Sequence, residues 1–92
     1  MPDYSTKRLS QVFKALANSR RMIIIKLLSK KPFSVIEIAR RLDMTVKVCS
    51  FHLLKMEREG ILQKIREGKF NVYSPTDSFK KSGIFRQIVR SY

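Results

Sequence analysis

Residues 34–73 read SVIEIARRLDMTVKVCSFHLLKMEREGILQKIREGKFNVY, and this stretch decides the predicted fold. It begins with a short amphipathic segment, passes through a brief turn into a longer amphipathic segment, and ends in two β-like runs joined around Gly68. The order of helix, turn, helix and hairpin is that of a winged helix-turn-helix. We therefore expect a helix-turn-helix over residues 34–59 and a wing over residues 61–74.

Local signals place the ends of both helices. Ser34 and Glu37 form a capping box that starts a helix reaching about Leu42. Thr45 can cap the following helix, and Gly60 stands where a left-handed stop is needed. The residues of that second helix expected to face the core are Cys49, His52, Leu53 and Met56.

Three further helices are predicted outside this stretch. Apolar residues recur with helical spacing from Leu9 to Leu16, which predicts a helix over residues 5–17. Asn18 can cap a second helix over residues 20–29 that is apolar nearly all round, and a last helix is expected over residues 77–92, with Asp77 as its cap. The fold class is mainly α with a small β-hairpin, about five helices plus the wing, in a single domain over residues 1–92.

The composition is that of a small and strongly basic protein. Its 92 residues include 20 Lys and Arg against 7 Asp and Glu, a formal net charge of +13. Such a surface attracts polyanions, because each neutralised phosphate releases condensed counterions. We expect double-stranded DNA as the partner and no membrane, although an anionic membrane would satisfy the same charge. A single cysteine and the lack of a long apolar run indicate a soluble, cytoplasmic protein.

Between Val12 and Ser74 the chain resembles the ArsR-type (arsenic-repressor-like) winged-helix transcription regulators. The segments that carry the resemblance are LANSRR at residues 16–21, FSVIEIA at 33–39, VCSFHL at 48–53, EGIL at 59–62 and REGK at 66–69. They follow one another in the family's order and spacing. The resemblance implies DNA binding and dimerisation, the latter through the first and last helices.

Metal sensing and catalysis lack the residues that they require. Where metal-sensing members of this family carry Cys-x-Cys on the third helix, this chain has Ser34 and Ile36, which supply no thiolate. Other members use aspartate and histidine on the last helix, whereas the one histidine here is His52. Cys49 and His52 are too few for a zinc site, so we expect helix-packing roles for both. We predict no metal, no cofactor and no enzymatic activity.

The helix over residues 45–59 has a mixed polar and apolar face opposite its buried stripe. The residues on that face, expected to bind DNA, are Val46, Lys47, Ser50, Phe51 and Leu54. Lys47 can donate to guanine, Ser50 to a base or phosphate, and Val46 or Phe51 can contact a thymine methyl group. Without Arg, Asn or Gln there, we expect moderate sequence specificity and a large phosphate contribution. One alternative is that Lys47 and Ser50 are only exposed to solvent. Another is that the helix is rotated by about 100° from the predicted phase, so that the apolar residues of this face belong to the core.

Two further groups of cations are expected to contact DNA. The wing offers Lys64, Arg66 and Lys69, which would lie along the backbone or enter the minor groove, unless they only solubilise a turn. Arg20 and Arg21 stand at a helix start, where cations oppose the helix dipole unless a phosphate approaches. Pairing of Arg21 with Glu57 or Glu59 is the alternative.

The first and last helices carry more apolar side chains than a chain of this length easily covers. Residues 1–17 and 77–92 are therefore the predicted dimerisation helices. The expected interface residues are Leu9, Val12, Phe13, Phe79, Ile84, Phe85, Ile88, Val89 and Tyr92. On this view Ile88→Glu should produce monomers. A membrane-surface helix is the competing interpretation of the last segment.

These features predict a dimeric DNA-binding transcription regulator that acts as a repressor by occluding a promoter. Its 45–59 helix would enter the major groove, and its wing would lie on the backbone or in the minor groove. The alternative is an abundant architectural or nucleoid-type DNA-binding protein with little sequence specificity, which the charge and the lack of bidentate readers favour. A winged helix that binds only proteins is a third hypothesis, and the charge argues against it.

Overall fold

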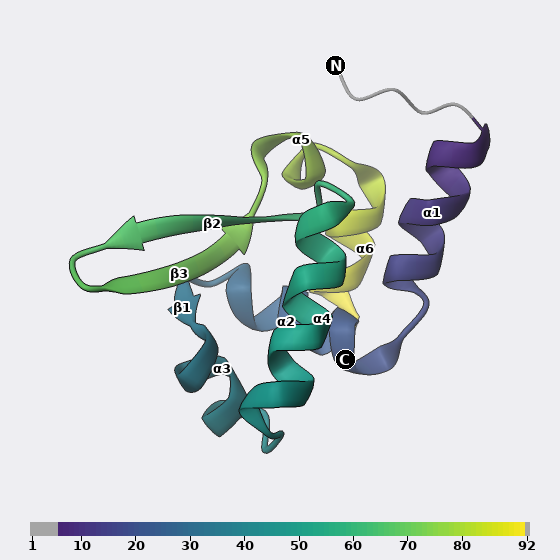
Figure 1. Ribbon diagram of the computed structural model, residues 1–92. Coiled ribbons are helices and arrows are strands. Elements are labelled where there is room, and N and C mark those ends of the chain that lie inside the picture. The colour runs from purple at the N-terminus through teal and green to yellow at the C-terminus, as the bar shows by residue number, and fades with distance from the viewer. Residues whose placement is uncertain (1–5, 92) are drawn as a thin grey trace.

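The computed structural model describes residues 6–91, which form six helices and one three-stranded antiparallel sheet (Figure 1). The elements are α1 (Thr6–Leu16), α2 (Ser19–Leu28), β1 (Phe33–Ser34), α3 (Val35–Arg41), α4 (Val46–Arg58), β2 (Leu62–Glu67), β3 (Phe70–Pro75), α5 (Asp77–Lys80) and α6 (Gly83–Arg90). The helices gather into one body from which the β2–β3 hairpin projects (Figure 1). No helix within these residues has the length and hydrophobicity that crossing a bilayer requires.

Side-chain caps start the predicted helix-turn-helix, α3 and α4. The Ser34 hydroxyl accepts a hydrogen bond from the Glu37 backbone N–H at 3.3 Å, and the Thr45 hydroxyl accepts one from the Val48 N–H at 3.1 Å. Each bond satisfies a backbone donor that has no partner within its helix. The order of helix, turn and helix is confirmed at these positions.

Two left-handed backbone positions end the helices where the chain must turn. Asp43, between α3 and α4, has φ 54°, which Asp tolerates better than most side chains. Gly60 has φ 74° just after α4, as its position in the sequence predicts. Helix α4 is therefore bounded on both sides by short turns.

The wing is the β2–β3 hairpin, which spans residues 62–75 where residues 61–74 were predicted. Gly68 has φ 63° at the first of the two turn residues, as expected in a type II′ hairpin turn. The strand β1 was not predicted; its Phe33 and Ser34 pair with Tyr73 and Val72 of β3. Two residues are too few to show alternation, and β1 exists only because β3 lies beside it.

The segment predicted as one helix over residues 77–92 is two helices, so six helices replace the expected five. Ser82 separates them, because its hydroxyl accepts a hydrogen bond from the Phe85 N–H at 3.2 Å and caps α6. Thr76, not Asp77, caps α5. The break resets the helical phase, which changes which apolar residues of this segment face inward.

The core lies between α2, α4 and the elements around them. Ile24, Ile25 and Leu28 of α2 are buried, whereas Ile23 is exposed, so α2 is less evenly buried than predicted. The remaining core residues come from every other helix and the sheet: Val12, Ala15, Leu16, Phe33, Ile38, Ala39, Cys49, Leu53, Met56, Ile61, Leu62, Phe79 and Ile88. The predicted first helix is confirmed over Thr6–Leu16, and its expected start at Ser5 lies outside the described residues.

Candidate nucleic-acid interface

The exposed side of α4 carries the residues predicted to bind DNA. Cys49, His52, Leu53 and Met56 are buried on the opposite side, so the helix phase is as predicted. The five predicted residues are all exposed: Val46, Lys47, Ser50, Phe51 and Leu54. The alternative in which the apolar three belong to the core is therefore wrong.

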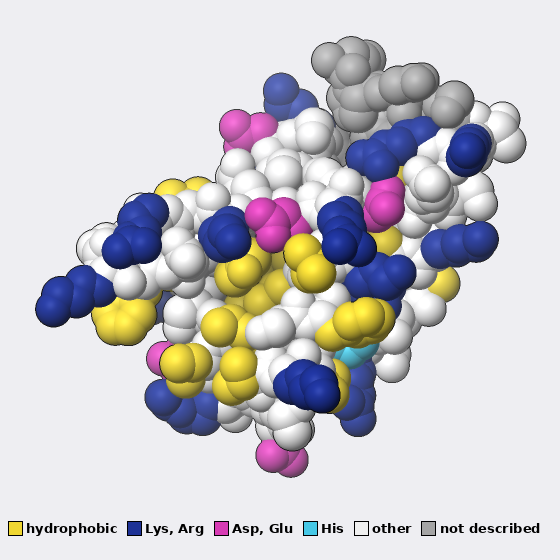
Figure 2. Space-filling model, viewed as in Figure 1, with side chains coloured by type: hydrophobic (Ala, Val, Ile, Leu, Met, Phe, Trp, Pro, Cys, Tyr) yellow, Lys and Arg dark blue, Asp and Glu magenta, His cyan; other side chains and the backbone are white. Residues whose placement is uncertain are grey.

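This side of α4 and the wing belong to one face of the molecule. Figure 2 shows hydrophobic side chains gathered over α4 and between α4 and the hairpin, with Lys and Arg around them. On the wing, Lys64, Arg66 and Lys69 are exposed, as are the apolar Ile65 and Phe70. Arg66 Nε donates to the Gly68 carbonyl at 3.0 Å, which holds the arginine side chain against the turn. The predicted cations of the wing thus face solvent, with Arg66 and Lys69 near the hairpin tip and Lys64 further along β2.

Arg21 joins the start of α2 to the recognition helix, a link that the sequence analysis missed. Its Nε donates to His52 Nδ1 at 3.0 Å and its Nη1 donates to the Ala15 carbonyl at 3.1 Å. Pairing of Arg21 with Glu57 or Glu59 is wrong, because no ion pair within residues 6–91 joins them, and Glu59 pairs instead with Arg8 at 2.5 Å. Arg21 therefore positions α4, while the neighbouring Arg20 is exposed to solvent.

Two cations near the end of α4 extend its exposed stripe. Lys55 and Arg58 are exposed, and Lys55 Nζ lies 5.9 Å from the centre of the Phe51 ring. Lys47, Phe51, Leu54 and Arg58 follow the spacing i, i+4, i+7, i+11, which marks one face of a helix. This spacing could have identified Arg58 from the sequence. Arg58 by its spacing and Lys55 by its place beside Phe51 are further candidates for phosphate contacts.

The burial of His52 beside Arg21 makes the fold sensitive to acid. Burial, and then the charges of Arg21 and Arg20, lower the pKa of His52 below its ordinary value of 6.5. The unfolded chain therefore takes up this proton at a higher pH than the folded chain does. We expect the free energy of unfolding to be at its full value above about pH 6.5 and to fall as the pH drops below it. Chemical denaturation between pH 7.5 and 5.5 would measure this.

His52→Gln is the matched variant, because an amide oxygen can accept the Arg21 hydrogen bond but does not titrate. His52 is the one histidine of the chain, so no other side chain has an ordinary pKa in this range. A variant that keeps the full pH dependence would contradict the assignment to His52.

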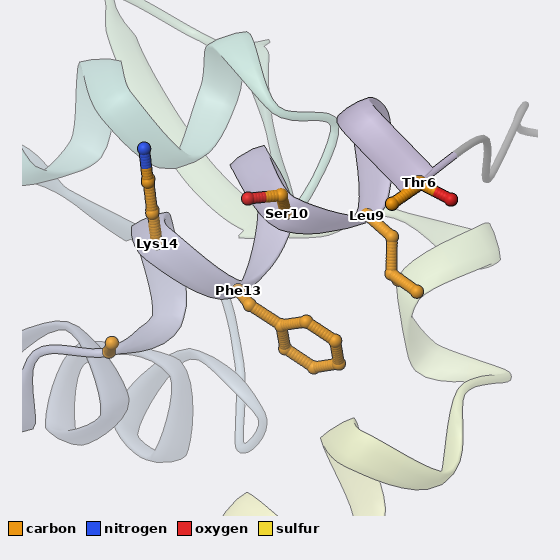
Figure 3. A pocket seen from close by; sticks show the side chains of 6 residues that line it. Thr6, Leu9, Ser10, Phe13 and Lys14 are labelled. Carbon is orange, nitrogen blue, oxygen red and sulfur yellow. The ribbon is translucent and has the colours of Figure 1, made fainter.

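A groove of about 900 Å³ lies between α1, the start of α2, and α6. It is lined by Phe13, Leu16, Ala17, Met22, Gly83, Ile84, Gln87, Ile88 and Ser91. A shallower hollow lies along α1, where Figure 3 shows Leu9 and Phe13 pointing toward the C-terminal helices and Lys14 pointing away. The predicted interface residues that are at least partly exposed are Leu9, Phe13, Ile84, Phe85 and Val89.

Three residues predicted at the dimer interface lie in the core instead. Val12, Phe79 and Ile88 retain 7%, 6% and 5% of their surface, because α1, α5 and α6 pack on the rest of the chain. They offer a partner almost no surface, and we remove them from the interface. Ile88→Glu consequently tests folding rather than dimerisation. Tyr92 lies outside the described residues.

The environment of Cys49 is apolar. The thiol is fully buried, lies 3.8 Å from the Val35 carbonyl oxygen, and has its pKa raised to about 11 by burial. Within residues 6–91, no three His, Cys, Asp or Glu side chains come together in a way that could hold a metal ion. The exposed side of α4 and the wing form a surface of cations and apolar side chains with the hydroxyl of Ser50, and this surface suits a polyanion.

A helix-turn-helix followed by a projecting hairpin defines the class of the protein as a winged helix-turn-helix. Residues 18–64, just over half of the chain, match the model of the bacterial regulatory protein arsR family. The chain is also 30% identical over 73 residues to the transcriptional activator HlyU of Vibrio cholerae serotype O1, a match that covers 79% of this chain and 68% of HlyU. The chain belongs to the ArsR family of bacterial transcription regulators, which are not enzymes.

Solved structures agree with this assignment. The homodimeric winged helix-turn-helix DNA-binding domain of a possible ArsR-family regulator from Mycobacterium bovis is 28% identical, with a TM-score of 0.78 and coverage of 90% of this chain and 73% of that one. HlyU from Vibrio cholerae is 25% identical in its structure, with a TM-score of 0.81 and coverage of 99% and 98%. The predicted fold class and the predicted family resemblance are both confirmed.

Proposed function

We propose that the chain is a homodimeric, sequence-specific DNA-binding regulator that inserts α4 into the major groove. The observation that carries this proposal is the exposed face of α4, which lies beside a cationic wing in a protein with a net charge of +13. In the helix-turn-helix, α3 supports α4, and the N-terminal turns of α4 meet the base edges. Lys47 and Ser50 supply polar contacts, and Lys64, Arg66, Lys69 and Arg20 neutralise phosphates.

Two chains would pair through the exposed apolar surface of α1 and α6, within the segments 1–17 and 77–92. This proposal is supported by the exposed Phe13 and Val89 and by the homodimeric state named for the Mycobacterium bovis relative. A two-fold axis would place two recognition helices about one DNA turn, or 34–36 Å, apart on an inverted repeat. The protein would work in the cytoplasm, with double-stranded DNA as its partner and with no metal or membrane.

Repression by occlusion is the action that we propose. A dimer bound across a promoter excludes polymerase without any further surface. The relative HlyU is named a transcriptional activator, so the direction needs its own test. A reporter with the binding site inside its promoter should lose expression when the protein is supplied, and a gain would overturn repression while leaving DNA binding intact.

An architectural protein with little sequence specificity is the second candidate. It is favoured by the absence of Arg, Asn and Gln between Thr45 and Lys55, since those side chains make the common bidentate base contacts. Selection from a random pool of double-stranded DNA at two salt concentrations separates the candidates. We expect an inverted repeat with half-sites about one turn apart to be enriched. Salt-sensitive binding without any enriched sequence would favour the architectural protein.

A pair of single-charge variants tests which cations contact phosphates only. We expect Arg66→Ala to weaken binding to all duplexes alike and to reduce the slope of log affinity against log salt by about one unit. The reason is that one phosphate contact and its counterion are lost. Binding titrations on selected and scrambled duplexes at several salt concentrations would measure both effects.

Lys47→Ala removes the same charge from α4 instead. We expect it to narrow the difference in affinity between the selected duplex and duplexes changed at one position, by about 1–3 kcal/mol at the base that Lys47 contacts. If the wild type and Lys47→Ala show the same difference in affinity between the selected and the changed duplexes, Lys47 does not contribute to sequence recognition.

A further inference from the structure

The exposed face of α4 is poor in hydrogen-bonding side chains for a surface that meets base edges. Of its exposed residues between Thr45 and Lys55, only Lys47 and Ser50 can donate a hydrogen bond. The apolar side chains are large and open, with Val46 46%, Phe51 54% and Leu54 46% exposed. We call these three residues the apolar stripe of α4. They would be covered best by a partner that has apolar groups of its own.

The contacts around Phe51 hold its ring in place at the surface. The ring meets that of His52 edge-on, with centres 6.0 Å apart and planes at 63°. The charged ends of Arg21 and Lys55 lie 6.0 Å and 5.9 Å from its centre. His52 is in turn fixed by the hydrogen bond from Arg21. Phe51 therefore presents an ordered apolar surface beside two cations, an arrangement suited to an apolar group that lies between phosphates.

The major groove offers one apolar group of this kind, the 5-methyl group of thymine. The other base-edge groups in that groove are hydrogen-bond donors or acceptors, apart from the C5–H of cytosine, which lacks the methyl group. Resting on the proposed insertion of α4 into the major groove, we propose that the protein reads its half-sites chiefly through thymine methyl groups packed against Phe51, Val46 and Leu54. Lys47 and Ser50 add polar contacts next to these methyl groups, and the specificity comes from apolar complementarity rather than from bidentate hydrogen bonds.

Replacing thymine by deoxyuridine tests the proposal without changing the protein. The replacement deletes only the methyl group and keeps the Watson–Crick pair. In the duplex enriched by selection, single replacements along a half-site should reveal at least one position where affinity falls about three- to five-fold, as expected for one buried methyl group. Symmetric replacement in both half-sites should give about the square of that loss. A scrambled duplex of equal length, with and without deoxyuridine, controls for effects on duplex shape.

A pair of phenylalanine variants assigns the effect to α4. In Phe51→Ala the ratio of affinities for thymine and deoxyuridine should fall toward one at a position where the wild type discriminates. Phe70→Ala removes a ring from the wing that is at least as exposed, 64% against 54% for Phe51, and should leave that ratio unchanged, whatever it does to overall affinity. Both rings are solvent-exposed, so both variants should fold, and circular dichroism spectra would establish this. The same loss of discrimination in both variants would overturn the assignment to α4.

The outcomes separate this inference from the function on which it rests. An enriched operator bound equally well with thymine and with deoxyuridine at every position would overturn methyl readout and leave the regulator in place. The apolar stripe would then belong to a protein partner. If selection yields no enriched sequence, the sequence-specific function fails first, and methyl readout fails with it.

Discussion

Phe13→Glu should convert the protein to a monomer and lower its affinity for the selected operator about 100-fold or more. Phe13 is 49% exposed on α1, lines the groove toward α6, and points toward the C-terminal helices (Figure 3). If this surface pairs with a second copy, a carboxylate there would be buried in each subunit's half of the interface, and burying an unpaired charge is unfavourable. Without the second subunit, the avidity of two linked recognition helices is lost. Sedimentation equilibrium and operator titration would measure the two effects.

Gln11→Glu is the matched control for this substitution. Gln11 is exposed on the same helix but lines a different pocket, whose other lining residues include Lys55 of α4 and Glu59 just after it. Gln11→Glu adds the same single negative charge as Phe13→Glu. It should remain dimeric. A Phe13→Glu protein that sediments as a dimer would exclude this surface from the interface, even if operator binding were weakened.

Ile88→Glu should abolish the folded state rather than produce a folded monomer. Ile88 is 5% exposed and belongs to the core cluster, and its helix α6 packs against α2. An unpaired carboxylate in this position costs about 3–5 kcal/mol, a large share of the roughly 5–15 kcal/mol that holds a domain together. Thermal unfolding followed by circular dichroism would show the transition lost or shifted far down.

Ile88→Val distinguishes a packing effect from a general intolerance at this position. It deletes one methylene group, which costs about 0.5–1.5 kcal/mol, and it should keep a cooperative transition. A folded, monomeric Ile88→Glu protein would contradict the burial of Ile88 and return this residue to the interface.

The contrast between Phe13 and Ile88 shows what the apolar pattern alone could not decide. Both stand in apolar stripes, and both were predicted to lie at the interface. The hydrogen bond that makes Ser82 a cap breaks the last segment in two, and this break turns Phe79 and Ile88 inward. Whether a serine caps a new helix or sits within a longer one depends on the packing of both pieces. A local pattern does not contain that information.

The helix-turn-helix was predictable because its signals are local. Ser34 and Thr45 lie within three residues of the backbone groups that they cap, and the buried stripe of α4 follows from helical spacing. The strand β1 and the bond from Arg21 to His52 depend on segments distant in the sequence. The exposed face of α4 was therefore correctly predicted, whereas the role of Arg21 in holding His52 of α4 was not.

The ratio of affinities for the selected operator and for a scrambled duplex, at one fixed salt concentration, tests the central claim most directly. A dimer that reads both half-sites through α4 should bind the operator at least about 10³-fold more tightly. A ratio near one would mean that the charge of +13 carries the binding by itself, and the protein would then be a coating protein rather than a sequence-specific regulator.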